Sequence, residues 1–304
     1  MFYLTCCYKK YITDYKNIIE IFNKNNIPYV IFASSETYEN LKKFNANVVK
    51  IPFKVPPWIK DYLPQIFLPT KNFRSKGILI SYLYKPPYLK KINSAIDTFI
   101  SFFKRNYIAS QNIICIDSPI PLDGGALVNV YVDKKILILK ASEWPEDKLL
   151  PSLSACLDLT IKQISVKSNN KFFHLDSVFN IFPSRKNDKT FCILTLKDKL
   201  TSQALSYILS TIRSFLYYET YCFKFDVDNP QILDYRHISA TLNGIVFNGI
   251  YFYPSFTGMP YPTDFITFLE THGYKAVPIY IDNLLKDGGG LACITWNGWF
   301  LSSF

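Results

Sequence analysis

The sequence predicts an α/β protein, and three observations carry this prediction. Short apolar segments with strand composition alternate with longer amphipathic segments through the N-terminal third of the chain. The same alternation returns in the second half. No Pro-, Gly- or Ser-rich linker separates the two halves. Although 304 residues suffice for one large or two ordinary domains, we therefore expect residues 1–304 to form a single compact domain.

The N-terminal third shows the alternation most clearly. Its apolar and amphipathic patterns predict strands at 2–7, 29–33 and 48–53 and helices at 11–25 and 36–44. Two consecutive prolines, Pro56 and Pro57, then interrupt the pattern just before Trp58. A long helix is predicted after this interruption, at 90–105.

The rest of the chain repeats the theme with shorter elements. We expect strands at 112–117, 127–132, 135–139, 165–166, 173–179, 191–196, 245–253 and 277–281. Helical patterns lie between them at 145–159, 202–215 and 263–272. No self-similar sequence period is visible by eye.

Composition narrows the class of protein. Hydrophobic residues make up 49% of the chain and charged residues 19%, a balance typical of folded globular domains. No apolar run reaches the roughly 18 residues of a membrane span. The apolar N-terminal stretch is too short for a signal peptide, and Lys9 and Lys10 follow it rather than precede it. These features predict a cytoplasmic protein without a membrane partner.

The charge and the cysteines exclude further classes. The net charge is +10, from 34 basic and 24 acidic residues, but only five of the basic residues are arginine and the lysines form no block. We interpret this as a solvated lysine-rich surface and expect no specific nucleic-acid partner. Seven cysteines without a C-x-x-C pair argue against a zinc site and a secreted disulfide framework, so we expect no metal. The oligomeric state has no sequence signal.

Polar residues recur at or near the ends of the predicted strands. From Asp61 to Asp123, His174, Asn243 and Cys293 the steps are 62, 51, 69 and 50 residues, and one fifth of the chain is about 61. Such spacing suits five similar units around a common axis, each contributing to one central site. Each residue also has an ordinary structural interpretation: helix cap, turn residue, core histidine or small buried apolar group.

The chemistry of these residue types is that of an activated thiol. Cys293 follows three consecutive glycines, 288–290, which let a ligand approach the backbone closely. His174 and Asp176 are two residues apart, so in a strand at 173–179 both side chains would face the same side. A carboxylate favours the imidazolium, and an imidazolium beside a thiol favours the thiolate. This pattern is typical of nucleophilic cysteine catalysis.

Five short motifs, in order along the chain, resemble those of the guanidine-modifying, or pentein, superfamily. They look most like the agmatine deiminase and bacterial-type peptidylarginine deiminase branch. Residues 58–64 are similar to its Trp-x-Arg-Asp-Tyr-Gly-Pro segment, and residues 122–125 to Glu-Gly-Gly or to the Leu-Asp-Gly-Gly of dimethylarginine hydrolases. Residues 174–176 match His-x-Asp, and residues 240–254 resemble the branch's asparagine segment. Residues 288–295 resemble Gly-Gly-Gly-x-His-Cys-Ile-Thr.

The resemblance implies a five-bladed α/β propeller of ββαβ units with pseudo-fivefold symmetry. It also implies a cysteine hydrolase that acts on a small-molecule or peptidyl guanidino group without a cofactor. In that interpretation Cys293, His174, Asp123 and Asn243 are catalytic, and Asp61, Asp176 and Trp58 bind the substrate. The chain departs from the branch at Lys60, Leu63, Asp123 and Ala292, where the motifs have Arg, Gly, Glu and His. These departures bear on which substrate is bound.

Three alternatives stay open at this point. An amidinotransferase would share the fold and the covalent intermediate but pass the amidino group to an amine instead of water. A dimethylarginine-hydrolase-like specificity is suggested by the Leu-Asp-Gly-Gly at 122–125. A non-catalytic binding protein of the same fold would have no need to keep a thiol, an imidazole and carboxylates in order.

Overall fold

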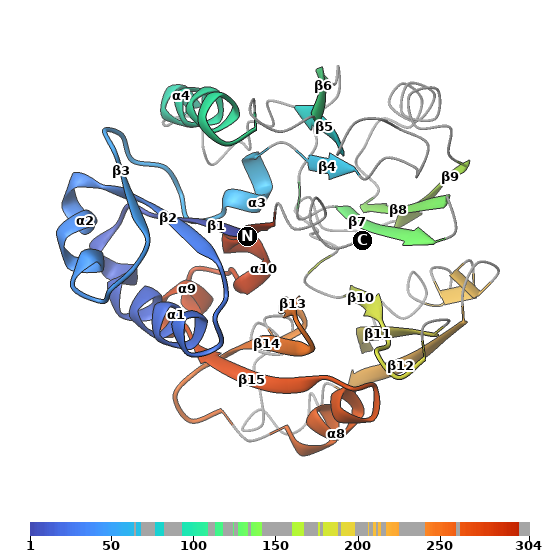
Figure 1. Ribbon diagram of the computed structural model, residues 1–304. Helices are drawn as coiled ribbons and strands as arrows, with labels where there is room; N and C mark the ends of the chain where they lie inside the picture. The colour runs from blue at the N-terminus through green and yellow to red at the C-terminus, as the bar shows by residue number, and fades with distance from the viewer. Residues whose placement is uncertain are drawn as a thin grey trace.

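The computed structural model shows an α/β architecture (Figure 1). It describes residues 1–63, 65–67, 77–81, 93–108, 113–117, 124, 127–132, 135–141, 160–166, 176, 179–187, 190–197, 206, 209–210, 212–213, 217–224, 241–259 and 262–297.

Five small sheets contain all the strands of the described residues, and Figure 1 shows them arranged around a common centre. Their strand order repeats. In each sheet one strand pairs antiparallel with a central strand, which pairs parallel with the next strand along the chain. The predicted α/β class is confirmed.

The N-terminal sheet joins the two ends of the chain. Strands β1 (Phe2–Cys6), β2 (Tyr29–Ser34) and β3 (Val48–Ile51) are parallel neighbours, linked through α1 (Ile12–Lys24) and α2 (Ser35–Lys42). Every residue of β1 and β2 is buried, as expected for parallel strands with near-continuous apolar sequence. The two-residue strand β16 (Trp296–Asn297) pairs antiparallel with β1, so the end of the chain completes the first sheet.

The other four sheets follow in chain order, and their strands are β4 (Gln65–Phe67), β5 (Gly77–Ser81), β6 (Ile113–Asp117), β7 (Leu127–Val132), β8 (Lys135–Ala141), β9 (Thr160–Val166), β10 (Phe179–Pro183), β11 (Thr190–Lys197), β12 (Tyr217–Lys224), β13 (Ile245–Phe247), β14 (Ile250–Ser255) and β15 (Lys275–Tyr280). The remaining helical elements are η1 (Lys9–Tyr11), α3 (Ile59–Tyr62), α4 (Asn93–Phe103) with the π-helical η3 (Lys104–Ile108), α8 (Thr263–Thr271), α9 (Asp282–Lys286) and α10 (Leu291–Ile294).

Two predicted strands were wrong in part. The segment 245–253 is a hairpin rather than one strand, because Asn248 and Gly249 take positive φ values of 45° and 77° and reverse the chain between β13 and β14. The segment 173–179 is not a continuous strand either, because Asp176 lies in a 3-10 turn and β10 begins only at Phe179. The helix predicted at 145–159 lies outside the described residues. The one predicted at 202–215 is helical where it is described.

Aromatic packing binds the N-terminal sheet to its neighbours. Phe32 of β2 stacks edge-to-face against Phe99 and Phe103 of α4, and Trp296 of β16 packs on Phe103 in the same cluster. On the other side, Phe22 of α1 contacts Phe252 of β14. These clusters hold the N-terminal sheet, including β16, against α4 and β14.

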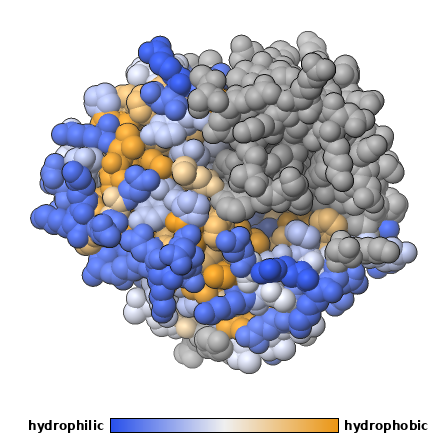
Figure 2. All heavy atoms as spheres, in the orientation of Figure 1, coloured by the Kyte–Doolittle hydropathy of each residue, from blue (hydrophilic) through white to orange (hydrophobic). Residues whose placement is uncertain are grey.

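The surface agrees with the composition. Where the face in Figure 2 is coloured, hydrophilic residues predominate along the rim, with hydrophobic residues interleaved nearer the middle. Large hydrophobic residues that are exposed among the described residues are Met1, Tyr217 and Tyr280. The described helices include none that is long and apolar enough to cross a membrane.

Candidate active site

A short helix places two of the charged residues of the site. Strand β3 ends at Ile51, the two prolines follow, and α3 begins directly after Trp58. Ile59 and Tyr62 are buried on one side of α3, and the hydroxyl of Tyr62 donates a hydrogen bond of 2.7 Å to the carbonyl of Pro56. This anchor leaves Lys60 and Asp61 on a rigid turn, with Asp61 only 3% exposed.

The glycine segment 288–290 leads into the helix that carries the thiol. Gly288 has a φ of +90°, a left-handed conformation that favours glycine. At the next two glycines there is no room for a side chain. A Cβ at Gly289 would overlap the ring of Trp58, and a Cβ at Gly290 would lie 2.6 Å from the Cβ of Asn243. The glycines therefore let α10 and Cys293 pack closely against α3 and the asparagine.

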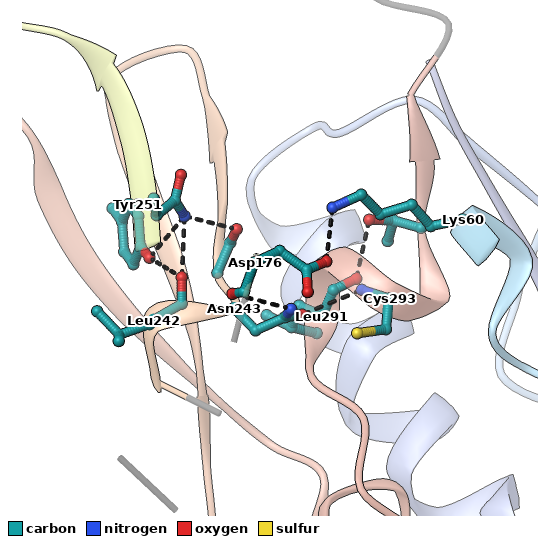
Figure 3. A network of polar contacts seen from close by, with 10 residues as sticks. Lys60, Asp176, Leu242, Asn243, Tyr251, Leu291 and Cys293 are labelled. Atoms are coloured by element: carbon teal, nitrogen blue, oxygen red, sulfur yellow. Dashed lines mark hydrogen bonds and ion pairs between the residues drawn. The ribbon is translucent and has the colours of Figure 1, made fainter. Parts of the chain in front are cut away.

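Asn243 joins the thiol segment to the carboxylate segment (Figure 3). Its Oδ1 accepts a 3.0 Å hydrogen bond from the backbone N–H of Cys293, and its own carbonyl accepts one of 3.0 Å from Ala292. Its Nδ2 donates a 3.4 Å bond to the carbonyl of Asp176. The side chain of Asn243 thus connects Asp176, 67 residues earlier in the chain, with Cys293, 50 residues later. Asn243 itself is only 3% exposed.

A second amide supports the segment around Asn243, where a helical turn ends at Leu242. Asn180 of β10 donates from Nδ2 to the carbonyl of Leu242 at 2.9 Å, and the hydroxyl of Tyr251 donates to the same carbonyl at 3.1 Å. Figure 3 shows the side chain of Tyr251 directed at this carbonyl. Burial raises the pKa of Tyr251 far above its ordinary value, so its hydroxyl stays a donor. The segment that positions Asn243 is therefore fixed from two strands.

Asp176 offers a buried carboxylate with one oxygen engaged. Its Oδ2 accepts a 2.6 Å bond from Nζ of Lys60, and the side chains are 7% and 22% exposed, respectively. Its Oδ1 is buried and has no hydrogen-bond partner among the described residues. A buried carboxylate oxygen without a donor is costly, and a cationic ligand with N–H groups would satisfy it.

Lys60 is the positive charge at the centre of these groups. Burial works against its charged form, but the Asp176 carboxylate, together with Cys293 and Asp61, outweighs that cost and raises the pKa of Lys60. The thiol of Cys293 is 8% exposed and interacts electrostatically with this ammonium. The described part of the site thus combines one thiol, one ammonium and two carboxylates.

The structure brings together most of the predicted site residues that it describes. Asp176, Asn243 and Cys293 are linked through hydrogen bonds of Asn243, and Asp61 and Trp58 lie on and beside α3, which packs against α10. His174 and Asp123 lie outside the described residues, so their placement stays a prediction. The argument that His174 and Asp176 share one face of a strand was wrong for Asp176, because this residue lies in a turn.

Sequence reasoning missed Lys60 and the two groups that hold the segment around Asn243. Lys60 stands inside the first motif, and its departure from arginine was the available signal. Asn180 and Tyr251 carry no sequence signal, since an amide and a phenol in strands are ordinary residues. Among the described residues, no group of three or more His, Cys, Asp or Glu side chains could hold a metal ion.

Comparison with known proteins identifies the fold. No protein-family model matches the sequence, and no curated protein matches it. Among solved structures, agmatine deiminase of C. jejuni superposes with a TM-score of 0.70 at 12% identity, covering 97% of this chain and 92% of the other. The chain has the fold of the pentein deiminases.

Two further structures agree with this result. Agmatine deiminase of Enterococcus faecalis gives a TM-score of 0.66 at 13% identity, covering 97% of this chain and 92% of the other. The N-terminal domain of ArgZ, an arginine dihydrolase from Cyanobacteria, gives 0.60 at 11% identity and covers 97% and 96%. The resemblance predicted from the motifs is confirmed as a likeness of fold to pentein-superfamily deiminases.

Proposed function

We propose that this protein is a cysteine hydrolase that removes ammonia from a guanidino group, with agmatine, arginine or a peptidyl arginine as the substrate class. We also propose that its five sheets are the blades of a closed five-bladed propeller whose central pit is the active site. The mixed α/β fold shared with agmatine deiminases supports both proposals.

One observation carries the proposal: the side-chain amide of Asn243 bonds to the backbone N–H of Cys293 and to the backbone carbonyl of Asp176, so the segments that carry a buried thiol and a buried carboxylate are held together. A guanidinium is a planar cation with N–H donors around its rim, and carboxylates recognise it through charge-assisted hydrogen bonds. The Oδ1 of Asp176 has no donor among the described residues and is suited to accept one from such a cation. Asp61, also buried, is assigned to the opposite side of the substrate, and the ring of Trp58 to its aliphatic part.

Cys293 acts first in this mechanism. The thiolate attacks the central guanidino carbon and forms a tetrahedral adduct. His174, as the imidazolium, gives its proton to the departing nitrogen, and ammonia leaves. The carbon–nitrogen bond is broken and a carbon–sulfur bond remains, so the intermediate is a covalent thiouronium.

Water completes the reaction. His174, now neutral, takes a proton from water, and the hydroxide attacks the thiouronium carbon. The sulfur then leaves as the thiolate, the hydroxyl proton passes to the released ammonia or to solvent, and the product is a ureido compound. Asp123 orients His174 or holds a substrate nitrogen, and Asn243 positions the cysteine through its backbone N–H. The steps need no metal or organic cofactor.

The experiment is a colorimetric screen for ureido product with agmatine, arginine and an arginine-containing peptide. We expect product from at least one of them with the wild-type protein and none with Cys293→Ala. Cys222→Ala, which removes a half-buried thiol in β12, is the matched control and should keep the wild-type rate. Full activity of Cys293→Ala would contradict the assignment of the nucleophile, and no product from any guanidino compound would contradict the proposed function.

The same screen tests the transfer reaction. With an added primary amine, a hydrolase still gives the ureido product, whereas an amidinotransferase gives a new guanidino compound. We expect the ureido product to dominate.

A further inference from the structure

The mechanism above leaves one central group without a role, the ammonium of Lys60. This side chain is only 22% exposed, although it carries a charge, and it reaches from α3 to the carboxylate of Asp176 at 2.6 Å. A buried lysine is expensive to desolvate and is kept charged only where other charges compensate for the cost. The cost of placing this ammonium among the site residues indicates that the charge has a role there.

The first consequence of this contact concerns Asp176. Lys60 engages Oδ2 and leaves Oδ1 buried and without a hydrogen-bond partner among the described residues. A carboxylate held by one oxygen cannot rotate freely, so its second oxygen keeps one direction. Lys60 thus presents Oδ1 in a fixed orientation.

The second consequence concerns the thiol. Cys293 lies on α10, which packs against α3, the helix that carries Lys60. The charged groups that act on Lys60 include Asp176, Cys293 and Asp61. Cys293 favours the charged form of Lys60, which means that thiolate and ammonium attract one another. The same attraction acts in the other direction, so a charged Lys60 favours the thiolate of Cys293. Asp61 and Asp176 bring negative charge to the same site, and the ammonium of Lys60 is a positive charge that offsets theirs.

We infer that Lys60 is a positioning residue that serves as the fixed positive charge of the site, holding Asp176 through Oδ2 and sustaining the thiolate of Cys293. The inference deepens the proposed function and rests on it for its purpose. An ammonium stays charged throughout the neutral range, unlike an imidazole, and so keeps the nucleophile ionised whatever the protonation state of His174.

The test measures ionisation of the thiol directly. Iodoacetamide reacts with thiolates, so the rate of Cys293 alkylation, followed by peptide mass spectrometry between pH 5 and 10, gives the midpoint of thiol ionisation. In Lys60→Met we expect this midpoint to rise by about one pH unit or more, and the alkylation rate at pH 7 to fall about tenfold or more. Lys60→Arg, which keeps the charge, should stay within about threefold of wild type at pH 7.

Two controls separate the charge from other effects. Lys54→Met removes a lysine that is paired with Glu36 on the surface and should leave the alkylation of Cys293 unchanged. Asp176→Asn removes the carboxylate, so adding Lys60→Met to this variant tests whether the lysine acts on the thiol itself. We expect the midpoint to rise again in the double variant relative to Asp176→Asn.

Each outcome decides the inference. Unchanged midpoints in Lys60→Met, or equal midpoints in Asp176→Asn with and without Lys60→Met, would overturn it. If circular dichroism shows that Lys60→Met does not fold, Lys60→Gln supplies the second neutral variant, with the same expected shift. Alkylation does not require turnover, so a shifted midpoint in a protein that forms no ureido product would refute the proposed function and keep Lys60 in its role. Turnover with an unshifted midpoint would refute the role of Lys60 and leave the proposed function standing.

Discussion

The glycine segment 288–290 is held at its two ends in opposite ways. Just before it, Asp287 accepts hydrogen bonds from Nζ of Lys10 at 2.7 Å and from the hydroxyl of Tyr11 at 2.6 Å, at a site where the lysine and aspartate side chains are 58% and 39% exposed. Just after it, Ala292 and Cys293 bond to the buried Asn243. One anchor is an exposed ion pair and the other a buried amide.

The difference shows where the precision of the site comes from. An exposed ion pair is screened by water and salt and typically contributes less than about 1 kcal/mol. A buried amide that satisfies backbone groups cannot be removed without leaving them unpaired, which costs about 1–3 kcal/mol. We therefore expect the outer anchor to steady the segment and the inner anchor to set the position of the thiol.

The largest effect is expected at the inner anchor. Asn243→Ala removes the acceptor of the Cys293 N–H and the donor to Asp176. We expect the free energy of unfolding, measured by urea denaturation, to fall by about 1–3 kcal/mol. Activity on a guanidino substrate should fall about 100-fold, because small displacements of a reacting group have effects of this size.

A matched amide on the surface provides the control for this variant. Asn17 donates one 2.8 Å hydrogen bond to the carbonyl of Tyr280 at an exposed position. Asn17→Ala should change stability by less than about 0.5 kcal/mol and leave activity unchanged. Similar activity losses in both variants would show that Asn243 has no special part in placing Cys293.

The glycines themselves give the next test. Gly290→Ala places a Cβ 2.6 Å from the Cβ of Asn243, whereas Gly288→Ala has open space around its Cβ but a φ of +90°. Overpacking costs about 1–3 kcal/mol and a left-handed conformation about 1–2 kcal/mol, so urea denaturation should show comparable losses of stability. Only Gly290→Ala should lower activity, by about tenfold to 100-fold, because only it displaces the asparagine.

Equal losses of activity in the two glycine variants would contradict the distinction between the outer and the inner anchor. If Gly288→Ala lowered activity as much as Gly290→Ala, the conformation at the start of the segment would matter as much for the thiol as the inner anchor does.

Local pattern was sufficient to predict the elements of the N-terminal sheet. The helix expected at 11–25 and the strand expected at 29–33 match α1 and β2. Their buried positions are occupied by apolar residues, so the sequence pattern alone predicts both elements. The hairpin β13–β14 was missed although Asn248-Gly249 is a strong turn signal, because apolar residues continue on both sides of it. Strand β16 has only two residues, and what makes it a strand is its pairing with β1 from the far end of the chain.

The site residues that belong to sequence motifs could be predicted, whereas those whose role depends on contacts in the folded chain could not. Asp176, Asn243 and Cys293 were found from motifs in order, and the structure ties them together through Asn243. Lys60 was treated as a departure from a motif, because the pairing of an ammonium with a carboxylate 116 residues away depends on the folded chain. The same holds for Asn180, whose amide matters only because β10 lies beside the segment at residue 242.

The smallest effect is expected at the outer anchor. Hydrogen bonds first from Lys10 and then from Tyr11 lower the pKa of Asp287, while burial and then Asp287 raise the pKa of Tyr11 to about 12, so the phenol remains a donor at neutral pH. Asp287→Asn keeps the shape and removes the charge. We expect the free energy of unfolding at neutral pH to fall by less than about 1 kcal/mol, with activity retained.

The pH dependence of this small effect identifies its cause. Because the folded state lowers the pKa of Asp287, its contribution to stability is complete above the ordinary carboxyl pKa and is lost as pH falls through the lowered folded value. The difference in stability between wild type and Asp287→Asn should therefore be constant above about pH 5 and shrink below about pH 4. Urea denaturation at a series of pH values measures it, and added salt should reduce it further. A difference that persisted at pH 3 would mean that the charge of Asp287 is not its cause. A loss of activity as large as that of Asn243→Ala would mean that the exposed anchor also governs the position of the thiol.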